Sequence, residues 1–266
     1  MTSSLDGAGL PVLVLTHAPH EGPGLIGRLL GVPYRIRTVL DDPAPRLPAA
    51  DELAGLVVMG GSMDADDVRG HPGLAAETRL IGDAVAAGLP VLGVCLGMQL
   101  LALALGAPLR RRAGQEIGFG SVDLVADDPL LSALGPVGSS PTVLHWHSDV
   151  VEPPPGATVL ASTDTTPVQA FRAGSALGIQ FHVELDANQL DLWLTTQDMV
   201  GGLSDDEVHQ IRRDGAAMLP GVCAAGAELA RRFGTQVISP AQVPRSATVD
   251  PPTRTDPSLR LDPAPR

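Results

Sequence analysis

One of the two cysteines in this 266-residue chain lies between two glycines, in the stretch Gly93-Val94-Cys95-Leu96-Gly97. An apolar run precedes it and an apolar helix-like segment follows it, which predicts a sharp strand-to-helix turn. Flanking glycines remove the Cβ atoms that would clash in the strained backbone of such a turn. The N-terminus of the helix would favour thiolate over thiol. The pattern therefore predicts a cysteine nucleophile, with the backbone N–H of Leu96 free to stabilise an oxyanion.

A cysteine nucleophile needs a base, and the base needs an orienting group. The stretch GIQFHVE (178–184) supplies His182 at the end of an apolar strand and Glu184 two residues later. Residues i and i+2 of an extended chain project to the same side, so the carboxylate can hold the imidazole in one tautomer. Taken alone, each residue has a simpler interpretation. Cys95 could be a buried thiol that packs as a small apolar side chain, His182 a hydrogen-bonded histidine at a strand end, and Glu184 a solvated charge in a loop. Together they predict a triad of Cys95, His182 and Glu184.

The elements that must position these residues are short apolar runs that alternate with helix-like patterns. The first runs cover residues 10–16, 34–40, 54–60 and 90–95. The clearest helical pattern covers residues 74–87. Strands of this kind alternating with helices predict a parallel sheet covered on both faces. More closely spaced runs predict an antiparallel extension of the sheet, and they cover residues 120–125, 141–147, 157–163, 168–173 and 176–182. The predicted fold class is α/β, a three-layer sandwich with a central, mostly parallel sheet.

The pattern becomes helical after Glu184. Three helical segments are predicted, at residues 188–199, 204–219 and 222–233. Ser204 and Glu207 have the spacing of a capping box. From residue 239 onward Pro, Ser, Thr, Asp and Arg dominate, and such a segment cannot bury enough apolar area to offset its ordering entropy. We therefore predict a catalytic domain over residues 1–185, a helical extension packed on the same domain over 186–235, and a disordered Pro-rich tail over 236–266.

Composition limits the class of protein. The net charge of −12, from 18 basic and 30 acidic residues, argues against nonspecific binding to nucleic acid or to an anionic membrane. No apolar stretch approaches the roughly 20 residues that span a bilayer, and the start lacks the basic and apolar regions of a signal peptide. Two cysteines cannot form a disulfide framework. These features predict a cytoplasmic protein with neither a nucleic-acid partner nor a membrane partner.

The stretch VLGVCLGMQLLA around Cys95, together with GIQFHVE, resembles the class I, or triad, glutamine amidotransferases. Within them it is most similar to the glutaminase domain of GMP synthetase and its stand-alone relatives. The likeness covers roughly residues 10–184. It implies the flavodoxin-like fold of that family, L-glutamine as substrate, no cofactor, and an ammonia-accepting synthetase as partner. It also implies an amidotransferase half without its acceptor half, and the oligomeric state is left open.

Further blocks extend the resemblance to the pocket around the nucleophile. VVMGGSMDA (57–65) matches the turn that supplies the second oxyanion donor and contacts glutamine, which implies that Gly60 binds substrate and that Gly61 joins Leu96 in the oxyanion hole. Gln99, four residues after the nucleophile, matches a residue that helps to seat glutamine.

Two later blocks also follow the order of the family. Residues 114–124 match the segment after the small strands that follow the elbow helix. Residues 145–171 match the stretch whose histidine-containing turn closes the glutamine pocket, which implies backbone contacts from Ser148 and Asp149.

The chain departs from the family pattern at two positions. Val183 stands between the triad histidine and glutamate, where the family commonly has Pro, a residue that stiffens the segment without donating chemistry. Ser62 follows the two glycines of the oxyanion turn, where Pro is common, and this leaves the exact oxyanion donor open.

Other residues of catalytic type have simpler interpretations. His145 and His147 would face one side of a strand, as metal ligands often do, but the sequence shows no carboxylate or cysteine spacing near them, so we predict no metal site. Residues 64–67 (DADD) predict a solvated acidic loop beside the active site that could meet a basic partner, and residues 110–112 (RRR) a solvated edge that could dock an acidic one. Cys223 is predicted to pack within a helix.

The leading hypothesis is hydrolysis of the L-glutamine side-chain amide through a γ-glutamyl thioester on Cys95, with the ammonia passing to a separate enzyme. A γ-glutamyl hydrolase or transferase, acting on a γ-glutamyl amide of an amine or peptide, would need no ammonia-consuming partner. A non-catalytic binding module is the third hypothesis, and the complete triad argues against it.

Overall fold

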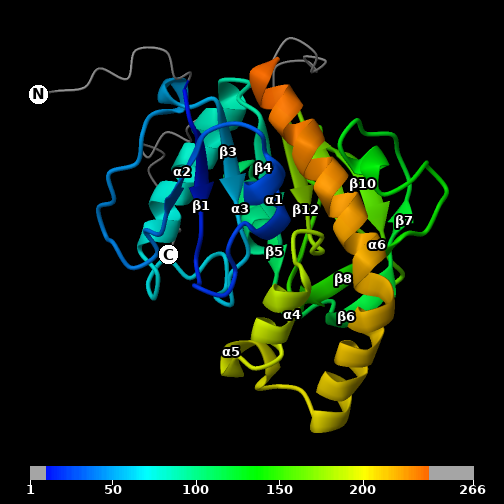
Figure 1. Ribbon diagram of the computed structural model, residues 1–266. Coiled ribbons are helices and arrows are strands. Elements are labelled where there is room, and N and C mark those ends of the chain that lie inside the picture. Colours follow the sequence, from blue (N-terminus) through cyan, green and yellow to red (C-terminus); the bar gives the residue numbers. More distant parts are fainter. Residues whose placement is uncertain (1–9, 240–266) are drawn as a thin grey trace, which may run out of the picture.

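A computed structural model describes residues 10–239, and Figure 1 shows its layers. The centre is an eight-stranded sheet in the order β2-β1-β3-β4-β12-β11-β10-β7. Its strands are β1 (Val12–Leu15), β2 (Tyr34–Arg37), β3 (Gly55–Val58), β4 (Val91–Val94), β7 (Asp123–Leu124), β10 (Thr158–Ser162), β11 (Ala170–Ala173) and β12 (Ala176–Ile179). The pairs from β2 through to β12 are parallel, and those from β12 through to β7 are antiparallel. The predicted mostly parallel sheet with an antiparallel extension is therefore confirmed.

The central strands are buried on both faces, as their continuous apolar runs predict. Every residue of β1, β3, β4 and β12 is buried, whereas the four residues of the edge strand β2 are exposed. Alternate residues of a strand point to opposite faces. In β1, Val12 and Val14 accordingly join one apolar core, and Leu13 and Leu15 join the other.

Helices cover both faces of the sheet and complete the three layers (Figure 1). They are α1 (Gly24–Leu29), α2 (Gly73–Ala86), α3 (Leu96–Ala104), α4 (Ala187–Trp193), α5 (Gln197–Val200) and α6 (Asp205–Ile238), with short 3-10 turns at Ala50–Glu52 and Leu131–Ala133. Residues of α1 and α6 pack in the core that contains Val12, and residues of α2 and α3 in the core that contains Leu13. The predicted three-layer α/β sandwich is confirmed.

Two small sheets lie beside the central one. They pair β6 (Glu116–Ser121) with β8 (Thr142–His147), and β5 (Leu109–Arg110) with β9 (Val150–Val151). The expectation that residues 141–147 extend the central sheet was therefore wrong. Leu144 of β8 packs with Trp193 of α4 and Ile211 of α6 in a third apolar cluster, whereas Val143 on the opposite face of β8 joins the core that contains Val12.

The C-terminal helices differ from the predicted boundaries. Residues 188–199 divide between α4 and α5, and the two later segments form one 34-residue helix, α6, that continues through Pro220. An interior proline costs about 3 kcal/mol, but apolar residues on both sides of it, such as Leu219 and Phe233, are buried against the rest of the protein. The predicted capping box at the start of α6 is present. Residues 236–238 are helical rather than part of a tail, and residues 240–266 lie outside the described part of the chain.

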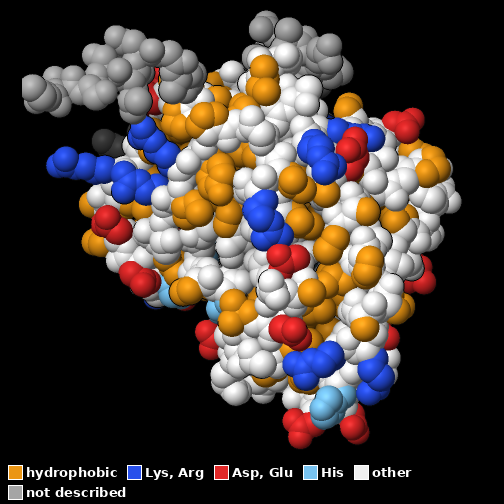
Figure 2. Space-filling view, in the orientation of Figure 1, with side chains coloured by type: hydrophobic (Ala, Val, Ile, Leu, Met, Phe, Trp, Pro, Cys, Tyr) orange, Lys and Arg blue, Asp and Glu red, His pale blue; other side chains and the backbone are white. Residues whose placement is uncertain are grey.

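The surface over α6 is mixed in character. Figure 2 shows that apolar and uncharged side chains cover much of this face, and that charges of both signs gather at its lower end, where α6 begins. The first turn of α6 contains Asp205, Asp206 and Glu207, where acidic side chains complement the helix dipole. Among residues 10–239, no helix combines the length and the hydropathy that a membrane span requires.

Candidate active site

Cys95 occupies the turn between β4 and α3, and its backbone has φ 53° and ψ −109°, a conformation that residues with side chains rarely adopt. The flanking glycines make this turn sterically feasible. A Cβ on Gly93 would lie 2.6 Å from the carbonyl oxygen of Gly97, and a Cβ on Gly97 would lie 2.0 Å from the carbonyl oxygen of Val58. The strand-to-helix elbow expected from the sequence is therefore present.

His182 and Glu184 form a buried pair next to this elbow. His182 Nδ1 lies 2.7 Å from Glu184 Oε1, and both side chains are almost fully buried. The other carboxylate oxygen, Glu184 Oε2, accepts a 3.0 Å hydrogen bond from the backbone N–H of Val183. The sequence predicts that His182 ends a strand, but β12 already stops at Ile179. His182 is held instead by an isolated bridge to Leu144 of β8.

The surroundings of His182 favour its protonated form. Burial opposes protonation, but the carboxylate of Glu184 and the sulfur of Cys95 together raise the pKa of His182 well above its ordinary value. Cys95 Sγ lies 3.8 Å from the backbone carbonyl of Trp146. The edge of the His182 ring also meets the indole of Trp193, at a centroid distance of 4.9 Å. This arrangement places a protonated imidazole beside the cysteine, as the partner of a cysteine nucleophile requires.

The glycine turn after β3 packs directly against the elbow. A Cβ on Gly61 would lie 2.5 Å from Leu96 Cδ2, and a Cβ on Gly60 would lie 3.4 Å from His182 Cε1. The ring of His17 anchors this turn by donating from Nδ1 to the carbonyl oxygen of Gly60 at 2.9 Å. The structure thus brings the residues predicted for the oxyanion hole together beside Cys95.

The other residues predicted to bind glutamine lie on two segments, the elbow helix α3 and the turn after β8. Gln99 lies on α3 one turn after Cys95, is buried, and donates from Nε2 to Gln180 Oε1 at 3.3 Å. Ser148 and Asp149 follow β8. The Ser148 carbonyl accepts the N–H of Gly114, and the Asp149 carboxylate accepts the N–H of Arg112. These bonds fix the turn after β8, and its contact with glutamine stays a prediction.

A group of buried ionisable residues, not predicted from the sequence, lies beside the glycine turn. His17 Nε2 lies 2.8 Å from Glu77 Oε2, and both side chains are fully buried. Burial lowers the pKa of His17, but the bond to Glu77 and its charge outweigh burial and raise it. Glu21 is buried as well, and burial raises its pKa to about 7 although the charges of His182 and His17 oppose the shift. For His17 and Glu21 the available signal was their place after β1, at the sheet edge where Cys95 lies, whereas Glu77 comes from α2 and had no such signal.

The charged surface segments near the site engage each other. Arg111 forms ion pairs with Asp64 at 2.7 Å and with Asp66 at 2.5 Å. Arg111 of the basic run is therefore paired with two carboxylates of the acidic loop, and a partner for either segment stays a prediction. Cys223 is half-buried in α6, where its Sγ donates to the carbonyl of Leu185 at 3.2 Å and burial raises the pKa of its thiol, as expected for a packing role.

The expectation that no carboxylate lies near His145 and His147 was wrong. A carboxylate does lie next to the histidine pair of β8, because β6 places Glu116 directly opposite His147, with Oε2 3.3 Å from His147 Nε2. The sequence gives no sign of this contact, since it depends on how two distant segments pair.

Comparisons with known proteins agree with this geometry. The family described as Glutamine amidotransferase class-I matches residues 28–199. The glutamine amidotransferase-like protein YfeJ of Salmonella typhimurium is 35% identical over 148 residues, which cover 54% of this chain and 62% of that protein. One subunit of the glutamine-hydrolyzing GMP synthase of Sulfolobus acidocaldarius is 38% identical over 102 residues, covering 36% of this chain and 52% of that protein.

The fold extends the likeness over more of the chain. The crystal structure of a glutamine amidotransferase from Methylobacillus flagellatus superposes with a TM-score of 0.74 and 27% identity, covering 90% of this chain and 98% of that one. The matched stretch spans less than two thirds of each of the two curated relatives, 62% of one and 52% of the other. From the family match over residues 28–199 and from the fold, the chain belongs to the class I glutamine amidotransferase family.

Proposed function

We propose that this protein is a glutaminase that hydrolyses the side-chain amide of L-glutamine, with Cys95 as nucleophile. The observation that carries the proposal is the strained elbow conformation of Cys95 beside a fully buried His182–Glu184 pair with a 2.7 Å contact. Both features are unfavourable for stability, because a strained backbone and buried ionisable groups cost free energy. They suit a reactive thiolate, and a binding module would need neither of them.

The proposed reaction has two steps. The Cys95 thiolate attacks the amide carbon of glutamine, and the backbone N–H groups of Gly61 and Leu96 stabilise the oxyanion. The imidazolium of His182 gives its proton to the departing ammonia, which leaves a γ-glutamyl thioester on Cys95. His182 then takes a proton from water as the water attacks the thioester, glutamate leaves, and Glu184 orients the ring throughout.

The ammonia would pass to a separate acceptor enzyme. The similarity to one subunit of a GMP synthase supports a synthetase as that partner, since the name of this relative describes one part of a larger synthase. The second candidate is a γ-glutamyl hydrolase or transferase with the same nucleophile, which would release an amine in place of ammonia.

The first experiment measures ammonia and glutamate release from L-glutamine by the purified chain. The Cys95→Ala variant should lose release of both products, and Cys223→Ala, the matched control at the other cysteine, should retain it. Equal release by the Cys95→Ala variant would contradict the proposal. Release from γ-glutamyl amides of amines but not from glutamine would favour the second candidate.

A further inference from the structure

Three side chains with metal-binding chemistry converge on one face of the small sheet formed by β6 and β8. Glu116 pairs with His147 across the two strands, and His145 lies two residues away on the same face of β8. One ligand atom from each of the three lies within 4.8 Å of the other two. All three come from paired strands, which position side chains more rigidly than loops do.

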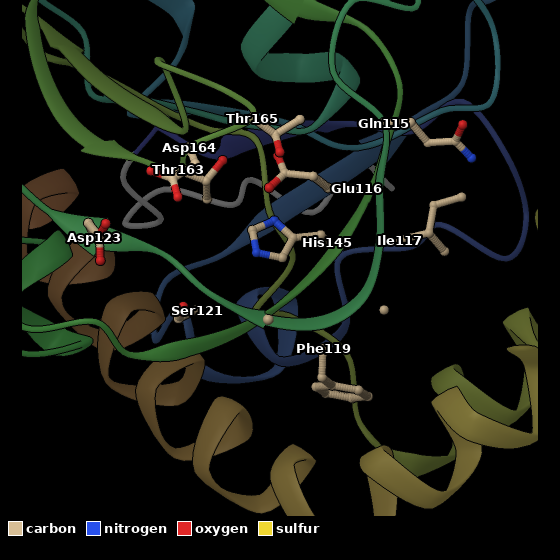
Figure 3. Close-up of a pocket in the computed structure, with 12 residues that line it drawn as sticks. Gln115, Glu116, Ile117, Phe119, Ser121, Asp123, His145, Thr163, Asp164 and Thr165 are labelled. Atoms are coloured by element: carbon tan, nitrogen blue, oxygen red, sulfur yellow. The ribbon is translucent and has the colours of Figure 1, made fainter.

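The hydrogen bonds of the two rings leave one nitrogen of each directed toward Glu116. His147 donates from Nδ1 to the backbone carbonyl of Asp149 at 3.3 Å, so Nε2 faces the carboxylate. The ring of His145 hydrogen bonds to the backbone of Ser121, while its Nδ1 is buried without a partner. Figure 3 shows the ring of His145 directed toward the Glu116 side chain. A histidine that binds a metal typically gives its other N–H to a carbonyl in this way.

The side-chain amide of Gln169 contacts two of these residues, Glu116 and His147. Its Nε2 lies 2.6 Å from Glu116 Oε2 and 3.4 Å from His147 Nε2, while its Oε1 is buried without a partner. Amide nitrogen and oxygen are assigned from the hydrogen-bond network, and a cation at this place would favour the opposite orientation. Turning the amide over would direct its oxygen at the cluster as a further ligand.

We propose that Glu116, His145 and His147 bind a divalent transition-metal ion, with zinc as the preferred occupant. Two imidazoles and one carboxylate are a common ligand set for zinc, whose ligands lie about 2.0–2.2 Å from the ion. Tetrahedral ligands at that distance are about 3.4 Å apart. The contact between Glu116 and His147 already has this spacing, at 3.3 Å, and small side-chain rotations would bring His145 to it.

An open pocket gives this cluster access to solvent. The pocket has a volume of about 470 Å³, and its lining includes Glu116, His145, Thr163 and Asp164 (Figure 3). An ion could enter by this route, and a water molecule could fill a remaining coordination position.

The site would be coupled to the catalytic centre through β8. Trp146, between the two histidines, has its carbonyl 3.8 Å from Cys95 Sγ, and Leu144 forms the bridge to His182. A bound ion would hold β8 firmly against β6, and it would therefore rigidify the strand that lies against the nucleophile and the triad histidine.

The test measures zinc binding to the full chain by calorimetry, in a Cys95→Ala background that removes the active-site thiol as a competing zinc ligand. We expect one zinc ion per chain, and at least about 100-fold weaker binding after His145→Gln or Glu116→Gln. His209→Gln, at an exposed position on α6, is the matched control and should leave the affinity unchanged. Failure to bind zinc, or equal binding by the His145→Gln variant, would overturn the proposal.

X-ray absorption at the zinc edge of the zinc-loaded wild-type protein gives an independent test that needs no variant to fold. The proposal predicts only nitrogen and oxygen neighbours at about 2.0–2.2 Å, including imidazole. A sulfur neighbour at about 2.3 Å would place the ion on a cysteine and refute the assignment. Neither experiment uses glutamine, so the outcome is independent of the proposed glutaminase activity.

Discussion

Glu21 is a buried carboxyl group beside the triad. Replacing it with glutamine tests how much its ionisation lowers the free energy of unfolding as the pH rises. The side chain is 5% exposed, and its Oε2 has no hydrogen-bond partner. Burial raises its pKa from 4.5 to about 7, against the opposing charges of His182 and His17. The folded protein therefore holds the proton of Glu21 more tightly than the unfolded chain does.

The sign of the pH dependence follows from this difference. Between pH 4.5 and about 7 the folded state retains a proton that the unfolded state has lost, so the free energy of unfolding falls as the pH rises through this window. Each tenfold difference in proton affinity is worth about 1.4 kcal/mol, so the loss attributable to Glu21 is about 3 kcal/mol at pH 8. Glutamine cannot ionise, and the Glu21→Gln variant should not show this loss.

The assay is urea unfolding of both proteins at several pH values from 5 to 8. The stability of the Glu21→Gln variant relative to wild type should increase by about 2.5 kcal/mol across this range, because part of the loss has already occurred at pH 5. Taking the difference cancels the groups that titrate alike in the two proteins. Asp51→Asn, at an exposed carboxyl group, is the control, and its difference from wild type should change little. A constant difference for Glu21→Gln, or one that falls as the pH rises, would refute the reasoning.

Two further substitutions test the packing around the site, each by chemical unfolding at pH 7. His17→Gln should destabilise the protein by about 3–5 kcal/mol, because it leaves the fully buried Glu77 without its partner. The exposed pair of His71 with Asp41 gives the control, since His71→Gln should cost less than about 1 kcal/mol, and similar losses for the two would contradict the role of burial. Gly226→Ala should cost about 3 kcal/mol, because the added Cβ would lie 1.8 Å from the carbonyl oxygen of Val183, the residue between His182 and Glu184. Gly221→Ala, in the same helix with no atom within 4 Å, should instead stabilise by about 0.5–1 kcal/mol, and a loss there would contradict the account.

The sequence predicted those parts of the fold that depend on local pattern. Continuous apolar runs identified β1, β3 and β4, because a strand buried on both faces leaves that signature in every residue. The glycines around Cys95 predicted the elbow, because the turn itself is local, although Gly97 also allows the close approach of the Val58 carbonyl from β3. The spacing of His182 and Glu184 likewise predicted their contact, which the structure places at 2.7 Å.

The missed features depend on contacts between distant segments. Nothing near His147 in the sequence shows that Glu116 lies opposite it, because that contact requires β6 and β8 to pair. The continuation of α6 through Pro220 depends on packing against the rest of the protein, which outweighs the local preference for a break. The pairing of His17 with Glu77 joins the end of β1 to α2 and has no local signature.

The most direct test of the central claim is covalent labelling with a glutamine analogue that carries an electrophilic carbon at the amide position, followed by peptide mass spectrometry. This measurement needs no ammonia acceptor, because it reports only whether the pocket binds a glutamine-shaped molecule beside a reactive thiolate. The account predicts one adduct, on Cys95, with Cys223 unmodified and with labelling slowed by excess L-glutamine. An unlabelled Cys95, or labelling that L-glutamine does not slow, would contradict it.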